Sequence, residues 1–161
     1  MPPPRVRVLF VCLGNICRSP TAEVVFRDTA TRAGLAGRVS VDSAGTGEWH
    51  VGNPPDWRAI EHARRRGYDL THLRARQVGP DDFAAFDYVL AMDAANLAAL
   101  AQLRPPHFAG HLGLFLDLAP DLGTREVPDP YDDGPQAFER MLDLIEDGSR
   151  ALAQAIVQRT R

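Results

Sequence analysis

Apolar residues occur in short unbroken runs along the chain, and stretches with helical spacing separate these runs. The segment RVRVLFV (5–11) ends in a continuous apolar run and FDYVLAMD (86–93) contains another, which is typical of strands buried on both faces of a parallel sheet. RVSVDSAGTG (38–47) predicts a further strand that runs into a loop with glycines, and HLGLFLDL (111–118) predicts a fourth. The pattern therefore predicts four strands.

Segments with helical spacing follow the strands. Between Ser19 and Gly34 apolar residues recur at helical spacing, so we expect a helix there, with Ser19 as its N-cap and Pro20 at its first position. Three more helices are expected, from about Pro55 or Asp56 to Gly67, from about Ala94, and from Pro135 to about Gln158.

The alternation of strands and helices predicts the fold class. We expect an α/β protein with a doubly wound, open, mostly parallel sheet of four strands in a flavodoxin-like order, with helices on both faces. The chain shows no internal repeat and no linker, so one domain over residues 1–161 is expected. Ligands of such sheets bind beyond the carboxyl ends of the strands, so the loop after the first strand is the expected site.

The composition narrows the classes of function. Hydrophobic residues make up 45% and charged residues 24% of the chain, as in ordinary globular proteins, and the formal net charge of -3 argues against nucleic acid as a partner. No apolar run is long enough to span a bilayer and no signal peptide is evident, so we expect no membrane insertion and a cytoplasmic location. Thiols are kept reduced there, so Cys12 and Cys17 are expected to be reactive rather than structural.

The loop after the first strand, CLGNICRS (12–19), has the composition of an anion site. Gly14 and Asn15 tolerate the backbone angles that turn successive N–H groups inward, at the positive end of the following helix. A thiol held there beside an arginine is favoured as the thiolate, which makes Cys12 a candidate nucleophile. Arg18 follows six residues later, and its planar fork can bind two phosphate oxygens at once.

Other interpretations of this loop remain open on the residues alone. A Walker phosphate loop needs a Gly-Lys-Ser/Thr sequence, which is absent, and a metal site would need two more ligands near Cys12 and Cys17, so neither a nucleotide nor a metal is expected. The two cysteines also fit a purely structural role, as small buried hydrophobic residues at a strand end. That interpretation explains Cys17, but it does not explain why Arg18 and Ser19 follow at once.

The segment VCLGNICRSPTAE (11–23) resembles the signature of the low-molecular-weight protein tyrosine phosphatases, Cys-x5-Arg-Ser after the first strand. The segments DSAGTGEWHVGNPPD (42–56), THLRARQV (71–78) and VPDPYDDG (127–134) resemble the family's other characteristic stretches in order and spacing. The resemblance thus covers the chain nearly from end to end.

The resemblance implies hydrolysis of phosphotyrosine in proteins, and of small aryl phosphates, through a phosphocysteine intermediate without a cofactor. Cys12 would be the nucleophile, Arg18 the phosphate clamp and Asp129 the general acid and base. On the residues alone, Asp132 and Asp133 serve as well as Asp129, and only the family pattern selects among them. The phosphate-binding residues implied by the pattern are Leu13, Gly14, Asn15, Ile16, Cys17 and Arg18.

Supporting roles also follow from the resemblance. Ser19 would hydrogen-bond the Cys12 thiolate, and Asn15, Ser43 and His72 would form a network that keeps the loop in shape. Further roles fall to Trp49 and Tyr131, which would line the cleft for a phenyl ring, and to Cys17, which would capture oxidised Cys12 as a reversible disulfide.

The residues of the loop also bear on which phosphorylated residue is the substrate. Ile16 favours phosphotyrosine, because the protein-arginine phosphatase branch of the family carries threonine there. A phosphotyrosine protein is thus the expected partner, with a tyrosine kinase as a candidate, and the acidic pair that includes Asp132 is expected to disfavour substrates with acidic flanks. The alternatives are a protein-arginine phosphatase, an arsenate reductase, for which a third cysteine is missing, and a non-enzymatic phosphate-binding module.

Overall fold

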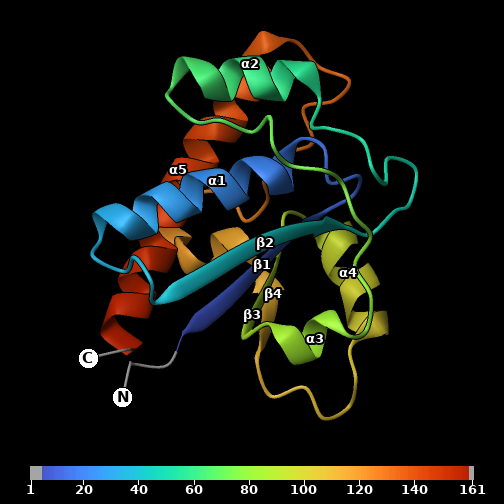
Figure 1. Cartoon of the computed structure of the whole chain (residues 1–161), viewed down its shortest axis with the longest axis vertical. Coiled ribbons are helices and arrows are strands. Elements are labelled where there is room, and N and C mark those ends of the chain that lie inside the picture. Colours follow the sequence, from blue (N-terminus) through green and yellow to red (C-terminus); the bar gives the residue numbers. More distant parts are fainter. Residues whose placement is uncertain (1–4, 160–161) are drawn as a thin grey trace.

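The computed structural model describes residues 5–159, which form one four-stranded sheet with helices on both faces (Figure 1). The strands are β1 (Val6–Cys12), β2 (Val39–Gly45), β3 (Tyr88–Ala91) and β4 (His111–Leu114). All neighbours are parallel and the strand order is β2-β1-β3-β4. The predicted fold class is confirmed, and β1 lies inside the sheet, as its continuous apolar run predicts.

Helices and two short 3-10 turns connect the strands. They are α1 (Arg18–Arg32), α2 (Trp57–Arg65), α3 (Asp82–Ala85), α4 (Ala94–Leu103), α5 (Pro135–Arg159), η1 (Phe115–Leu118) and η2 (Pro120–Leu122). Helices α1 and α5 cover one face of the sheet and α2 packs on α5, whereas α3 and α4 cover the other face (Figure 1). Within residues 5–159, no helix is long and apolar enough to cross a membrane.

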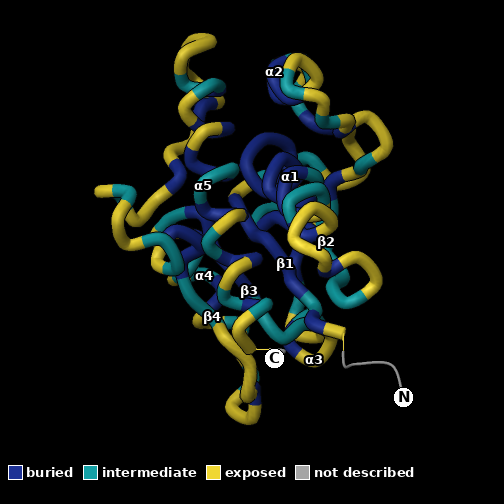
Figure 2. The backbone as a smooth tube through the Cα atoms, turned by 90° about the vertical axis from the view of Figure 1, so that its left-hand side faces the viewer, coloured by how far each residue is buried: buried dark blue, intermediate teal, exposed yellow. Residues whose placement is uncertain are grey.

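Strand β1 divides its side chains between two hydrophobic cores. Val8 and Phe10 pack in the core under α1 and α5, while Leu9 and Val11 pack in the core under α3 and α4. Successive residues of a strand point to opposite faces, so a run without polar residues is needed where both faces are covered. Figure 2 shows β1 as a buried strand at the centre of the molecule. This central position fixes the loop that follows Cys12.

The structure corrects three local predictions. The expected strand 111–118 ends at Leu114, and the remaining residues turn as the 3-10 helix η1. Helix α1 begins at Arg18, with Cys17 at the N-cap position and no side chain capping it, so Ser19 is not the N-cap. The Ser19 hydroxyl is instead directed to Cys12. The short helix α3 was not predicted, because four residues are too few to show helical spacing.

Candidate active site

The loop between β1 and α1 lies at the carboxyl edge of the sheet and packs against the end of β2. A Cβ added to Gly45 would lie 2.7 Å from the carbonyl oxygen of Leu13 and 3.0 Å from the amide nitrogen of Asn15. No side chain fits in that space, so glycine at this position allows the loop to lie flat on the sheet.

The carbonyl groups of the loop are bound from outside it. The carbonyl oxygen of Cys12 accepts a hydrogen bond from the amide of Thr46, that of Leu13 from Gly47, and that of Ile16 from Asp56, at 2.8 to 2.9 Å. Among the hydrogen bonds of residues 5–159, none uses an amide of residues 13–17 as its donor. Outward carbonyls and unused amides beside the start of a helix make an anion-binding nest.

Asn15 holds the loop in this shape. It is the one non-glycine residue with a positive φ, 57°, in the described part of the chain. Its buried amide donates to the hydroxyl of Ser19 at 2.8 Å and to that of Ser43 at 3.0 Å, and its carbonyl oxygen accepts from the backbone amide of Arg76 at 3.0 Å. Asparagine is one of the few residues that adopts this backbone conformation at low cost, and these bonds stabilise it further.

In the described chain, the network around Asn15 lacks one expected residue, His72, and includes two that were not expected, Glu23 and Arg76. Ser43 donates to the buried carboxylate of Glu23 at 2.7 Å, so Glu23 and Arg76 join the network. His72 lies exposed on the surface, and the hydrogen bonds of this network within residues 5–159 do not include it. A charged residue among the apolar positions of the first helix is the signal that would have pointed to Glu23.

Cys12 lies at the floor of the loop. The residue is only 3% exposed, and its sulfur is 3.0 Å from the hydroxyl oxygen of Ser19. The hydroxyl of Ser19 also accepts from Asn15 at 2.8 Å, and it can donate to the carbonyl oxygen of Ala44 at 3.3 Å or to the sulfur. A hydroxyl so placed can donate its proton to a thiolate and stabilise the negative charge on sulfur.

Arg18 is buried, with 2% of its surface exposed, and is held by one end of its guanidinium group. Its Nη1 donates to Asp93 at 2.6 Å and to the carbonyl oxygen of Val127 at 3.0 Å. Its Nε is buried without a partner in the described structure, and its Nη2 lies 3.6 Å from a carboxylate oxygen of Asp129. The Nε and Nη2 edge is therefore available to bind two oxygens of an oxyanion.

Charge keeps Arg18 protonated in spite of its burial. Burial acts to lower the pKa of Arg18, but the thiolate of Cys12 and the carboxylates of Asp93 and Asp129 outweigh it, and the net pKa is raised. Sequence reasoning missed Asp93, which also caps α4 through a hydrogen bond from the amide of Asn96 at 2.8 Å. Its place at the end of β3, next to β1 in the sheet, is what brings it to Arg18.

A cavity of about 240 Å³ opens above the loop. Its floor includes Cys12 and Arg18, and its rim includes Trp49, Asp129 and Tyr131. Trp49 is 70% exposed, and one oxygen of the half-exposed carboxylate of Asp129 accepts from the amide of Tyr131 at 3.1 Å. Nucleophile, cation, carboxylate and two aromatic side chains thus converge on one hollow, as an active site requires.

The second cysteine has a different environment. Cys17 is buried, and burial, together with the negative charges of Asp56, Cys12 and Asp129, holds its pKa far above the ordinary range. Both cysteines are free thiols. Cys17 therefore stays protonated and does not compete with Cys12 as a nucleophile.

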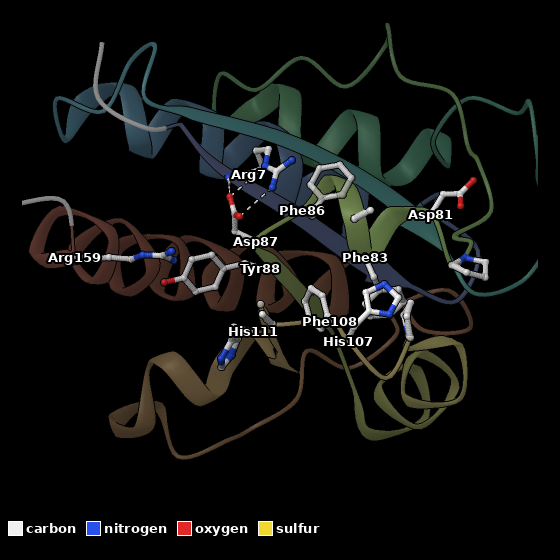
Figure 3. Close-up of a pocket in the computed structure, with 15 residues that line it drawn as sticks. Arg7, Asp81, Phe83, Phe86, Asp87, Tyr88, His107, Phe108, His111 and Arg159 are labelled. Atoms are coloured by element: carbon white, nitrogen blue, oxygen red, sulfur yellow. Dashed lines mark hydrogen bonds and ion pairs between the residues drawn. The ribbon is translucent and has the colours of Figure 1, made fainter. Parts of the chain in front are cut away.

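A larger cavity, of about 770 Å³, lies at the opposite, amino edge of the sheet (Figure 3). Arg7, Asp87 and Tyr88 line it at the starts of β1 and β3, and Arg7 is bound to Asp87 through both Nε and Nη2, at 3.3 and 3.1 Å. It contains no cysteine, and its ion pair is already closed. Within residues 5–159, no group of three or more His, Cys, Asp or Glu side chains is arranged to hold a metal ion.

The fold and the site define a class of protein: α/β enzymes that hold a phosphoryl group in a Cys-x5-Arg loop between the first strand and the first helix. A comparison with protein-family models identifies one family. The family model of the low molecular weight phosphotyrosine protein phosphatases matches residues 7–161, so the chain belongs to that family of cysteine-dependent hydrolases.

Individual relatives agree with this assignment. The low molecular weight protein-tyrosine-phosphatase YfkJ of Bacillus subtilis is 45% identical over 151 residues, which cover 94% of this chain and 96% of that protein. The crystal structure of YfkJ matches with a TM-score of 0.90 over 98% of each chain, and a protein tyrosine phosphatase of Entamoeba histolytica matches with 0.92 at 36% identity over 97% and 99%. A Drosophila arginine phosphatase is also similar, with a TM-score of 0.86 at 30% identity over 92% and 96%.

Proposed function

We propose that this enzyme hydrolyses phosphotyrosine in proteins by transferring the phosphoryl group to Cys12 and then to water. One observation carries the proposal: Arg18, whose Nε has no partner among the described residues and whose Nη2 is only 3.6 Å from Asp129, lines the same cavity as the thiol of Cys12. A phosphoryl group in that cavity would meet two donors of Arg18 and the loop amides, with sulfur beneath the phosphorus atom.

The first step needs a nucleophile and a proton. Cys12 attacks phosphorus in line, the bond to the leaving oxygen breaks, and Asp129 gives its proton to that oxygen. Arg18 and the amides of residues 13–18 hold the three equatorial oxygens. The proposal for Asp129 is supported by its position on the rim, 3.6 Å from Arg18 and beside the hollow that the leaving group must occupy.

The second step reverses the proton transfer. Asp129, now ionised, takes a proton from water, which attacks phosphorus and releases phosphate and the Cys12 thiolate. The hydroxyl of Ser19, 3.0 Å from the sulfur, stabilises the departing thiolate. Asn15 and Ser43 are positioning residues that do not touch the phosphoryl group, since they orient Ser19 and the loop.

Trp49, Tyr131 and Ile16 select the substrate in this proposal. The two aromatic side chains line a cavity suited to a phenyl ring, and Ile16 gives an apolar contact there. Phosphotyrosine is therefore the first candidate and phosphoarginine the second. An Ile16→Thr variant that gained phosphoarginine hydrolysis would show that this position sets the choice.

We also propose a redox safeguard and a compartment. Peroxide oxidises the Cys12 thiolate to a sulfenic acid. The sulfur of Cys17 then attacks that sulfur and gives its own proton to the departing hydroxide, so that water leaves and a disulfide forms that a cellular thiol reduces. Thiols are kept reduced in the cytoplasm, so we propose a cytoplasmic location. We also propose a single catalytic domain over residues 1–161. A protein tyrosine kinase would be the opposing enzyme.

The function is tested by hydrolysis of p-nitrophenyl phosphate in the presence of a chelator. The parent enzyme is expected to be active, Cys12→Ser to be inactive, and Asp129→Asn to be slower by about 10² to 10³. Parent-like activity of Cys12→Ser would contradict the proposal.

A further inference from the structure

A second hollow adjoins the catalytic cavity on the side of Tyr131. This groove, of about 380 Å³, runs between α2 and the start of α5. Trp57, Glu61 and Arg65 lie at successive turns on one side of α2 and form one wall, and Asp133 and Pro135 form the other. None of these five side chains has a part in the proposed hydrolysis.

The groove and the catalytic cavity are separate hollows that lie next to each other. Asp132 lines the cavity and Asp133, the next residue, lines the groove. Arg58 also lines the groove, and its Cζ atom is 5.2 Å from the centre of the Tyr131 ring, which borders the cavity. A polypeptide that places a phosphotyrosine in the cavity therefore passes over the groove when it leaves on this side.

Trp57 gives the groove an apolar wall. It is 75% exposed, the highest value among the exposed large hydrophobic residues of the described chain. Leu13, Trp49 and Tyr131, three others of that group, border the catalytic cavity. Large apolar side chains gathered around one opening mark a contact surface, and tryptophan contributes more than most residues to such contacts.

The charges of the groove favour a basic partner. Arg58 is bound by Asp56 at two distances of 3.0 Å, so that cation is neutralised within the cap of α2. Glu61 pairs with Arg65 at 3.3 Å and with Arg64 at 2.7 Å, so one positive charge remains on α2. Asp132 and Asp133 are exposed and form no ion pair within residues 5–159. These two carboxylates outnumber the one cation left on α2, so the net charge beside the groove is negative.

We propose that this groove binds the flanking segment of a phosphotyrosine protein, with an aromatic or large aliphatic side chain against Trp57 and a basic residue beside Asp132 and Asp133. The inference rests on the proposed function, because it assumes that phosphotyrosine occupies the cavity. It adds a recognition site that small aryl phosphates cannot reach.

The test compares two phosphotyrosine peptides of equal length that both carry lysine beside the phosphotyrosine. One has phenylalanine on both flanks and the other has glycine at those positions. Trp57→Ala is expected to lower kcat/KM about tenfold on the phenylalanine peptide, and to leave the glycine peptide and p-nitrophenyl phosphate within about twofold. Trp57→Phe is expected to retain most of the preference.

Val51→Ala is the matched control, because Val51 is an exposed apolar residue that does not line the groove. It is expected to leave both peptides unchanged. If Trp57→Ala lowers kcat/KM equally on both peptides, or on neither, the groove does not bind the flanking segment. Normal hydrolysis of p-nitrophenyl phosphate in the same variant would show that the catalytic site itself is unaffected. A parent enzyme that is inert towards p-nitrophenyl phosphate would overturn the proposed function itself.

Discussion

The two edges of the sheet each hold an arginine that is paired with an aspartate from a neighbouring segment, but the pairs differ in the part of the guanidinium they use. At the amino edge, Asp87 binds Arg7 through Nε and Nη2, the edge best suited to an oxyanion. At the carboxyl edge, Asp93 binds Arg18 through Nη1 and leaves Nε and Nη2 to the cavity. The same two residue types thus make a closed ion pair at one edge and an open anion site at the other.

This difference explains why the smaller cavity is the catalytic one. The hollow beside Arg7 has about 770 Å³ and the one above Arg18 about 240 Å³. Only the smaller brings together a thiol, an open guanidinium edge and a carboxylate. Converging groups that include a donor without a partner in the described structure, here the Nε of Arg18, identify a site better than its volume does.

The largest expected effect on activity comes from replacing the arginine at each edge of the sheet. Arg18→Lys is expected to lower kcat/KM for p-nitrophenyl phosphate by about 10³, because one ammonium group cannot replace the two-donor edge. Arg7→Lys is expected to change it less than about twofold, since that pair is distant and partly exposed. Steady-state kinetics of both variants decide this, and similar losses in the two would show that Arg18 acts only through folding.

The next effect concerns the loop itself. Asn15→Ala is expected to destabilise the protein by about 2 to 3 kcal/mol and to lower kcat about tenfold or more, because it removes two buried donors and places alanine at a φ of 57°. Asn15→Gly relieves the backbone but not the lost hydrogen bonds. Denaturant unfolding of both variants separates the two contributions, and parent-like stability of Asn15→Ala would contradict this account of the loop.

A smaller effect is expected in acid. The hydrogen bonds of Arg58 lower the pKa of Asp56 against the opposing effect of burial, and those of Arg7 lower the pKa of Asp87. A lowered pKa in the folded state gives stability that is present above the carboxyl's ordinary pKa of about 3.9 and is lost as pH falls below it. Removing either carboxylate should therefore reduce the loss of stability in acid.

We expect Asp56→Asn and Asp87→Asn each to remove part of the acid sensitivity, because each takes away a carboxylate whose pKa an arginine lowers in the folded state. Unfolding free energies measured from pH 6 down to about pH 3 give the two slopes. A steeper pH dependence in Asp56→Asn than in the parent would contradict the expected direction of the effect.

The smallest effect on turnover is expected at Cys17. Cys17→Ser should keep kcat within about twofold, because Cys17 stays protonated and its backbone amide is retained. After exposure to peroxide, the parent should recover with added thiol and the variant should not. Full recovery of Cys17→Ser would refute the safeguard.

Local patterns predicted the strands and the longer helices, because each shows an apolar run or helical spacing, whereas the four residues of α3 are too few to show one. The loop from Cys12 to Arg18 was also predicted at its observed place, because its residues are contiguous in sequence. Asp93 and Glu23 were missed because their roles arise only when β3 and α1 pack beside β1. The absence of His72 from the network around Asn15 has a similar origin, since the backbone of Arg76 reaches Asn15 instead.

The most direct test of the central claim is detection of the covalent intermediate. Asp129→Asn is mixed with p-nitrophenyl phosphate, quenched rapidly in acid and analysed by mass spectrometry of its peptides. The account predicts one added phosphoryl group on Cys12 and none in the Cys12→Ser, Asp129→Asn double variant. A phosphoryl group on another residue, or product formation with no covalent adduct at any time, would contradict it.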